Sequence, residues 1–120
     1  MESSALGGRT ILVVEAEPSA ALQVEAGLRE AGARVFGAHR LRDALHMAEH
    51  PALSAAVIAQ RLGSDSTSAV CRRLADLGVP FMLYTRHDAA EARQKWPAAP
   101  VVAKSASTRE LIDAVAELMH

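Results

Sequence analysis

Two acidic side chains stand at the end of the first apolar run of the chain, where they could bind a metal ion. Glu15 and Glu17 follow Ile11–Val14, and Pro18 then suits the first position of a helix. Adjacent carboxylates at such a strand tip supply the hard oxygen ligands that Mg²⁺ prefers, although the positive end of the helix also favours acids without a metal. Ala16 separates the two acids. A methyl group therefore replaces one of the carboxylates that a complete metal pocket would need.

The length and composition fit one domain of an ordinary globular protein. The chain has 120 residues, half of them apolar and 22% charged, and its formal net charge is −1. This charge gives no overall field that favours nucleic acid or anionic lipid. The single cysteine, Cys71, excludes an internal disulfide and fits a reducing compartment.

No segment of the sequence is typical of a membrane span or a secretion signal. The apolar runs are too short to cross a bilayer, and the N-terminus is polar and has no apolar signal core. We therefore expect a cytoplasmic protein. We also expect residues 1–8 to form a disordered tail before a single domain over residues 9–120.

Short apolar runs alternate with amphipathic helical patterns along the chain. Nearly continuous apolar runs are typical of strands buried on both faces of a parallel sheet. The expected strands are residues 10–14, 33–38, 55–59, 79–84 and 100–103. Three expected helices begin near Glu17, Asp88 and Ser107, and two more have apolar stripes over residues 41–48 and 70–77. This order predicts an α/β fold, a three-layer sandwich whose five-stranded parallel sheet has the flavodoxin-like order 2-1-3-4-5.

The carboxyl ends of parallel strands meet at one edge of the sheet, where such folds bind their ligands. The first strand brings Glu15 and Ala16 to this edge, and the third strand ends in Ala59. Thr85 and Lys104 follow the fourth and fifth strands. We therefore expect these five side chains to lie near one another.

On these residues the chain resembles the response-regulator receiver domain, the CheY-like family, over nearly its whole length. The resemblance is carried by ILVVEAEP (11–18), AAVIAQRLG (55–63), VPFMLYT (79–85) and VVAKS (101–105). It implies that two acids after the first strand and an Asp ending the third hold Mg²⁺, and that this Asp accepts phosphate from a histidine kinase. It also implies that a hydroxyl residue and a lysine after the last two strands bind the phosphoryl oxygens.

Carried over position by position, this resemblance is incomplete. Glu15, Thr85 and Lys104 match the first acid, the hydroxyl residue and the lysine. Ala16 replaces the second acid, and Ala59 replaces the phosphoacceptor. Alanine offers no oxygen nucleophile, and one carboxylate beside two methyl groups is a poor set of Mg²⁺ ligands. We therefore expect a degenerate receiver that lacks the phosphoacceptor Asp and binds Mg²⁺ weakly or not at all.

Two further departures concern the conformational switch and the lysine. Val101 stands where the family has its switch aromatic, and Ser105 replaces the proline that usually follows the lysine. A cis bond before Ser is unfavourable by about 2.5–4 kcal/mol, so we predict a trans Lys104–Ser105 bond. Because no phosphate would be held here, we hypothesise that Lys104 pairs with Glu15 in the emptied pocket.

These departures favour a stand-alone receiver-like signalling protein of a two-component (phosphorelay) system, acting by protein–protein contact and not as an enzyme. The expected partners are a histidine kinase or another receiver, and the expected homodimer uses the fourth helix, fifth strand and fifth helix. Trp96 precedes the fifth strand beside that surface, and Trp is enriched at binding hot spots. We expect no nucleic-acid or membrane partner.

Two alternatives stay open at the level of sequence. One is a true phosphoreceiver with a non-standard acceptor such as Asp65, in the loop after the third strand. The other is a small flavodoxin-like enzyme or ligand-binding protein, although the turn at 15–20 lacks the glycines that let a backbone approach phosphate. His46 and His50 have the i,i+4 spacing of a metal-binding pair, but no third ligand is evident.

Overall fold

The apolar runs of the sequence form a five-stranded parallel sheet in a computed structural model that describes residues 5–86 and 89–119. The strands lie in the spatial order β2-β1-β3-β6-β7. Their bounds are β1 (Thr10–Val14), β2 (Arg34–Ala38), β3 (Ala55–Ala59), β6 (Phe81–Thr85) and β7 (Val101–Ala103). Counted along the chain within this sheet, the order is 2-1-3-4-5. The predicted α/β fold and sheet order are therefore confirmed.

A short antiparallel hairpin, which the sequence does not predict, follows β3. Its strands are β4 (Arg61–Leu62) and β5 (Asp65–Ser66). The hydroxyl of Thr67, just after the hairpin, lies 2.7 Å from the carbonyl oxygen of Ala59 and 2.9 Å from that of Gln60. These contacts hold the hairpin against the tip of β3, so it borders the carboxyl edge of the sheet.

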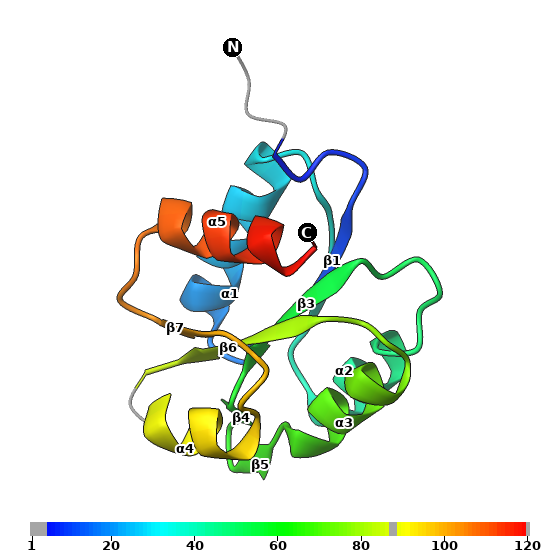
Figure 1. Cartoon of the computed structure of the whole chain (residues 1–120), viewed down its shortest axis with the longest axis vertical. Helices are drawn as coiled ribbons and strands as arrows, with labels where there is room; N and C mark the ends of the chain where they lie inside the picture. The colour runs from blue at the N-terminus through cyan, green and yellow to red at the C-terminus, as the bar shows by residue number, and fades with distance from the viewer. Residues whose placement is uncertain (1–4, 87–88, 120) are drawn as a thin grey trace.

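Helices cover both faces of the sheet and complete three layers (Figure 1). The helices are α1 (Pro18–Glu30), α2 (Leu41–Met47), α3 (Ser68–Asp76), α4 (Ala89–Lys95) and α5 (Thr108–Leu118). α1 and α5 pack on one face, and α2, α3 and α4 pack on the other. The edge strand β7 lies between α4 and α5 in this view, so all three elements share one side of the molecule.

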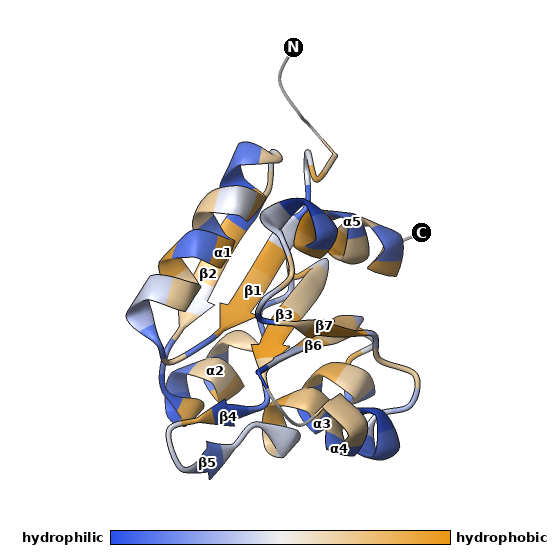
Figure 2. Cartoon of the chain, turned by 90° about the vertical axis from the view of Figure 1, so that its left-hand side faces the viewer, coloured by the Kyte–Doolittle hydropathy of each residue, from blue (hydrophilic) through white to orange (hydrophobic). Residues whose placement is uncertain are grey.

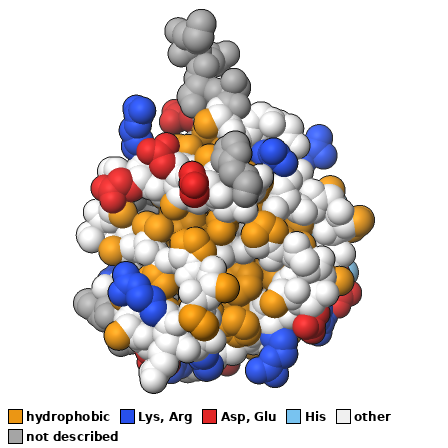
Figure 3. Space-filling model, in the orientation of Figure 1, with side chains coloured by type: hydrophobic (Ala, Val, Ile, Leu, Met, Phe, Trp, Pro, Cys, Tyr) orange, Lys and Arg blue, Asp and Glu red, His pale blue; other side chains and the backbone are white. Residues whose placement is uncertain are grey.

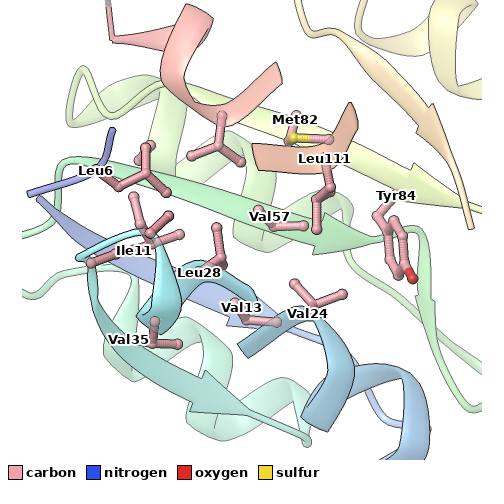
Figure 4. Close-up of a cluster of buried hydrophobic side chains, with 14 residues drawn as sticks. Leu6, Ile11, Val13, Val24, Leu28, Val35, Val57, Met82, Tyr84 and Leu111 are labelled. Atoms are coloured by element: carbon pink, nitrogen blue, oxygen red, sulfur yellow. The ribbon is translucent and has the colours of Figure 1, made fainter. Parts of the chain in front are cut away.

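Two hydrophobic cores form because successive side chains of a strand point to opposite faces of the sheet. Ile11 and Val13 of β1 join the core under α1 and α5, and Leu12 and Val14 join the core under α2, α3 and α4. The apolar strands β1 and β3 therefore lie between the helical layers (Figure 2). The first core is drawn in Figure 4, where side chains of α1, α5 and the strands converge.

Local signals in the sequence account for several helix boundaries. Pro18 opens α1, and Ser107 and Glu110 form the two reciprocal contacts of a capping box at the start of α5. Gly78 follows α3 with a φ of 73°, which glycine adopts without strain. The expected start of the fourth helix at Asp88 lies outside the described residues.

The N-terminal segment corrects one expectation. Leu6 is fully buried in the core beneath α1 and α5, and its backbone N–H donates a hydrogen bond to the carbonyl of Ala31 at 2.9 Å. Leu6 therefore packs on the domain, although residues 1–8 were expected to form a disordered tail. Residues 1–4 lie outside the described part of the chain.

We predict that Leu6→Ala lowers the free energy of unfolding by about 2–5 kcal/mol, because it opens a cavity in a closed core. Urea denaturation followed by circular dichroism measures this loss. Leu22→Ala is the matched control, since Leu22 on α1 is 68% exposed and its loss should change stability by less than about 0.5 kcal/mol. Equal stability of Leu6→Ala and the wild type would contradict the burial of this side chain.

Candidate functional site

The carboxyl edge of the sheet brings the predicted site residues together. Glu15 follows β1, its backbone N–H is bonded to the carbonyl of Ala38, and its side chain is only 3% exposed. Lys104 follows β7, its backbone N–H is bonded to the carbonyl of Thr85, and its Nζ lies 2.5 Å from Oε1 of Glu15. The hypothesised Glu15–Lys104 pair is therefore present, reaching across the tips of the strands that lie between β1 and β7.

Glu15 is also held by a backbone N–H and by the ring of a histidine. Its Oε2 accepts a hydrogen bond from the N–H of Glu17 at 3.1 Å, and its carbonyl oxygen lies 2.9 Å from Nδ1 of His39. Among the described residues, Oε1 has no partner in hydrogen-bonding geometry, so its contact with Lys104 is an ion pair without good angular alignment. The buried carboxylate thus depends on Lys104 for most of its compensating charge.

A second ion pair, which the sequence did not reveal, lies beside the first. Nη2 of Arg86, just after β6, is 2.5 Å from Oε2 of Glu17. Both side chains are about half exposed, so water weakens the attraction and the pair contributes little to stability. The pair does, however, neutralise the second acid at the tip of β1, so Glu15 and Glu17 each contact a cation.

These side chains do not fit a Mg²⁺ site of the kind that the family resemblance implies. Mg²⁺ needs several hard oxygen ligands in near-octahedral geometry. Ala16 and the buried Ala59 offer methyl groups, and the carboxylate of Glu15 is engaged by Lys104 and by a backbone N–H. Within residues 5–86 and 89–119, no group of three or more His, Cys, Asp or Glu side chains is placed to hold a metal ion.

The other sequence candidates lie apart from this edge. Asp65 is exposed in β5, where it pairs with Leu62 across the hairpin, and it is not among the residues that line the cavity beside Ala59, Thr85 and Lys104. Cys71 is buried in the core, and burial raises the pKa of its thiol to about 12. This high pKa leaves the thiol protonated and unreactive at neutral pH.

The peptide bond after Lys104 and the side chains of Val101 and Trp96 are the remaining sequence candidates. The peptide bonds of the described residues are all trans, so the predicted trans Lys104–Ser105 bond is confirmed. Val101 is half-buried and packs against the core on the α4 side. Trp96 is also half-buried, and its ring meets that of Phe81 edge-on at 5.6 Å between centroids. It lines an apolar groove of about 360 Å³ that also includes Pro97 and Leu118.

Tyr84 is a member of the site that sequence reasoning missed. It lies in β6, next to Thr85, and Nζ of Lys104 is 5.3 Å from the centre of its ring. A cation at this distance is attracted by the face of an aromatic ring. Burial, followed by the negative charges of Glu15 and Glu17, raises the pKa of Tyr84 above its usual value of 10.0.

We predict that Tyr84, the single tyrosine of the chain, loses its proton only above pH 10. Because its pKa is raised in the folded state, its contribution to stability is present below pH 10 and is lost as the pH rises through the folded-state pKa. Glu15→Gln should lower this pKa by removing a nearby negative charge. Ultraviolet titration of tyrosinate measures both values, and an unchanged pKa in the variant would contradict the contact.

A cavity of about 150 Å³ opens between the tips of β3 and β6. Its lining residues are Ala59, Gln60, Arg61, Tyr84, Thr85, Arg86 and Lys104. Thr85 is only 4% exposed, although it borders the cavity. Among the described residues, the lining contains three cationic side chains and no acid, at the position where the family resemblance implies a phosphoacceptor.

No protein-family model and no curated protein matches the sequence. Solved structures do match the fold. A response regulator receiver protein from Sinorhizobium medicae superposes with a TM-score of 0.84 and 26% identity, over 93% of this chain and 94% of that one. The fold is that of a receiver domain.

Two further receiver domains support this assignment of the fold. The non-phosphorylated HemR receiver domain from Leptospira biflexa has a TM-score of 0.83 and 18% identity, over 92% of this chain and 94% of that one. A receiver domain protein from Clostridium thermocellum has a TM-score of 0.81 and 15% identity, with the same coverage of 92% and 94%.

In the described residues of our chain, no helix is both long and apolar enough to span a membrane.

Proposed function

We propose that this receiver-like protein is a two-component signalling module that is not phosphorylated on aspartate and acts through protein contacts. The observation that carries the proposal is Ala59, a buried methyl group at the tip of β3 where an acceptor carboxylate would be needed. Lys104, which would otherwise face a phosphoryl group, is paired with Glu15. On this proposal the protein is not an enzyme, and Mg²⁺ binding is lost or weak.

Radiolabelled acetyl phosphate tests this proposal directly. The wild-type protein, incubated with it and Mg²⁺, should carry no covalent label after denaturation and gel separation. A phosphorylatable receiver treated in parallel shows that the reagent is active. Label on the wild type would overturn the proposal, and mapping the labelled residue would show whether Asp65 or another side chain is the acceptor.

The face formed by α4, β7 and α5 supports the proposed mode of contact. Figure 3 shows apolar side chains gathered in the centre of this face. Exposed cations stand on α4, at Arg93 and Lys95, and exposed acids stand on α5, at Asp113 and Glu117. A two-fold axis parallel to β7 would place α4 of one copy over α5 of the other. We propose a homodimer of this kind, with a kinase or another receiver as the alternative occupant of the face.

A charge exchange tests the dimer. Sedimentation equilibrium should show self-association of the wild type, and Asp113→Lys with Glu117→Lys should shift it toward monomer by placing cations against cations. A variant with Arg93→Glu and Lys95→Glu should also be monomeric alone. Mixing the two variants should restore a heterodimer, because each then offers the charge that the other lacks. Monomeric wild type, or no association on mixing, would contradict the proposed pairing.

Localisation follows from the same proposal. The described residues contain no membrane-spanning helix, and the one cysteine is buried and unpaired. A signalling module of this kind would meet its kinase or receiver partner in the cytoplasm, and we propose that compartment.

A further inference from the structure

We infer that the apolar groove beside Trp96 binds a small aromatic amine, a ligand with an aromatic ring and an ammonium group. The groove has a volume of about 360 Å³. It lies at the amino edge of the sheet, where Phe81 begins β6, and therefore at the opposite edge from Glu15 and Lys104. This inference goes beyond the proposed function, which concerns phosphorylation and contact with other proteins.

Three stretches of the chain form the groove. They are residues 75 and 78–81 between α3 and β6, residues 96–99 between α4 and β7, and Leu118 at the end of α5. Figure 3 shows apolar side chains gathered over this part of the molecule. Phe81 is only 8% exposed and meets the ring of Trp96 edge-on, so the aromatic part of the wall is held by the core.

The volume and the lining fit the apolar body of a small molecule. Sites that bury small ligands are roughly 300–1,000 Å³ in volume and are lined mostly by apolar and aromatic side chains. Among the described residues that line the groove, no side chain is charged, and the indole N–H of Trp96 is the only polar side-chain group. An aromatic ring would therefore find apolar contacts on most sides.

The groove offers few hydrogen-bond donors, which argues against an anionic ligand. Pro80 and Pro97 have no backbone N–H. Four further lining residues already donate their backbone N–H groups to carbonyls of their own turns, namely Gly78, Val79, Trp96 and Ala99. A carboxylate or phosphate would lose its hydration here without gaining enough new partners.

The charges around the groove favour a cation. Both α3 and α5 end at the groove, and the C-terminal end of a helix carries a partial negative charge. Asp76 and Glu117, both exposed, directly adjoin lining residues in the sequence, and Lys95 is the one cation that does so among the described residues. Arg73 in the last turn of α3 is paired with Glu49. An ammonium group at the rim would also meet the indole ring, whose face attracts cations.

Fluorescence of Trp96, the single tryptophan of the chain, reports occupancy of the groove. Three probes of similar size and different charge are titrated at neutral pH and constant ionic strength, namely phenethylamine, phenethyl alcohol and phenylacetate. The protein concentration is one at which sedimentation finds monomer, so that a second copy does not compete for the neighbouring face.

We expect a saturable change with phenethylamine. Its Kd should be lower than that of phenethyl alcohol by about threefold to tenfold, the order expected from a helix end and a cation–π contact. Phenylacetate should bind most weakly. A change with phenethylamine that does not saturate, equal Kd values for the three probes, or tightest binding of phenylacetate would overturn the inference.

A variant that fills the groove locates the binding. Ala75 is exposed and lines the groove, so Ala75→Phe should occupy the space and abolish the saturable change. Ala26→Phe is the matched control, because Ala26 is exposed on α1 outside the groove and its replacement should leave the Kd unchanged. Wild-type affinity in a folded Ala75→Phe would show that the groove is not the site.

A second variant tests the preference for a cation without changing the lining. Asp76→Asn combined with Glu117→Gln removes the two acids beside the groove and should raise the Kd of phenethylamine by about threefold. The Kd of the uncharged phenethyl alcohol should stay the same. If the ratio of the two Kd values remained that of the wild type, the assignment of an amine ligand would be wrong.

Discussion

Replacing Lys104 with methionine is expected to lower the free energy of unfolding by about 3–5 kcal/mol, the range measured when one partner of a buried ion pair is removed. The carboxylate of Glu15 is only 3% exposed, and among the described residues Lys104 is the one cation in contact with its Oε1. The variant would leave this charge buried without compensation. Chemical denaturation at neutral pH measures the loss.

Replacing the other partner of the pair, in Glu15→Gln, should lower the free energy of unfolding by less than Lys104→Met does. Lys104 is 18% exposed, so in Glu15→Gln its ammonium group can turn toward water while its methylene stem stays packed. The variant that combines Lys104→Met with Glu15→Gln should regain most of the stability that Lys104→Met loses, because no buried charge is left unpaired.

A matched lysine elsewhere controls for the loss of a methylene stem and a charge. Lys95 is exposed on α4, and Lys95→Met should change stability by less than about 0.5 kcal/mol. If Lys104→Met were as stable as Lys95→Met, the Glu15–Lys104 pair would not stabilise the fold. If Lys104→Met and Glu15→Gln lowered the free energy of unfolding equally, the argument from the deeper burial of Glu15 would be wrong.

The fold could be predicted because its strands carry a strong and simple pattern. Thr10–Val14 and Ala55–Ala59 are apolar apart from one Thr, and both form strands with the predicted bounds. Right-handed crossovers between parallel strands then limit the sheet to a few orders. Because the carboxyl ends of parallel strands share one edge, Glu15 and Lys104 could be expected near each other. Their pairing was a hypothesis that also depended on the receiver resemblance and the missing phosphoacceptor.

Some features of the fold and the site could not be predicted, because they depend on contacts between segments that show no helical or strand-like pattern of apolar residues. Leu6 is a single apolar residue in a polar segment, and the hairpin strands β4 and β5 have two residues each. Arg86 and Glu17 are 69 positions apart in exposed turns, where no pattern selects one partner over another. Tyr84 reads as one more apolar strand residue, and its contact with Lys104 appears only when the strand ends are placed in space.

Introducing Asp at both position 16 and position 59 is expected to create a phosphorylatable receiver. Ala16 follows β1 and Ala59 ends β3, so Ala16→Asp and Ala59→Asp would add two carboxylates to that of Glu15. Three carboxylates supply hard ligands for Mg²⁺, and the new side chain at position 59 supplies the nucleophilic oxygen. Thr85 and Lys104 already stand beside that position.

The expected result is Mg²⁺-dependent labelling of the double variant by acetyl phosphate, with no label on the wild type. Circular dichroism must first show that the variant is folded, because the Asp at position 59 is introduced at a buried site. Ala16→Asp with Ala59→Asn is the matched control, since the amide has nearly the shape of the carboxylate but is not a nucleophile.

The double variant also tests why, on our proposal, the wild type is not phosphorylated. Phosphoryl transfer needs Lys104 to face the new phosphate, so labelling requires the lysine to leave Glu15, which the added Mg²⁺ would then engage. If the folded double variant binds Mg²⁺ but takes no label, the missing carboxylates are not the only obstacle, and the trans Lys104–Ser105 bond or the altered lysine position also prevents the chemistry. If it takes label, the loss of two carboxylates is sufficient to explain a receiver fold without phosphorylation.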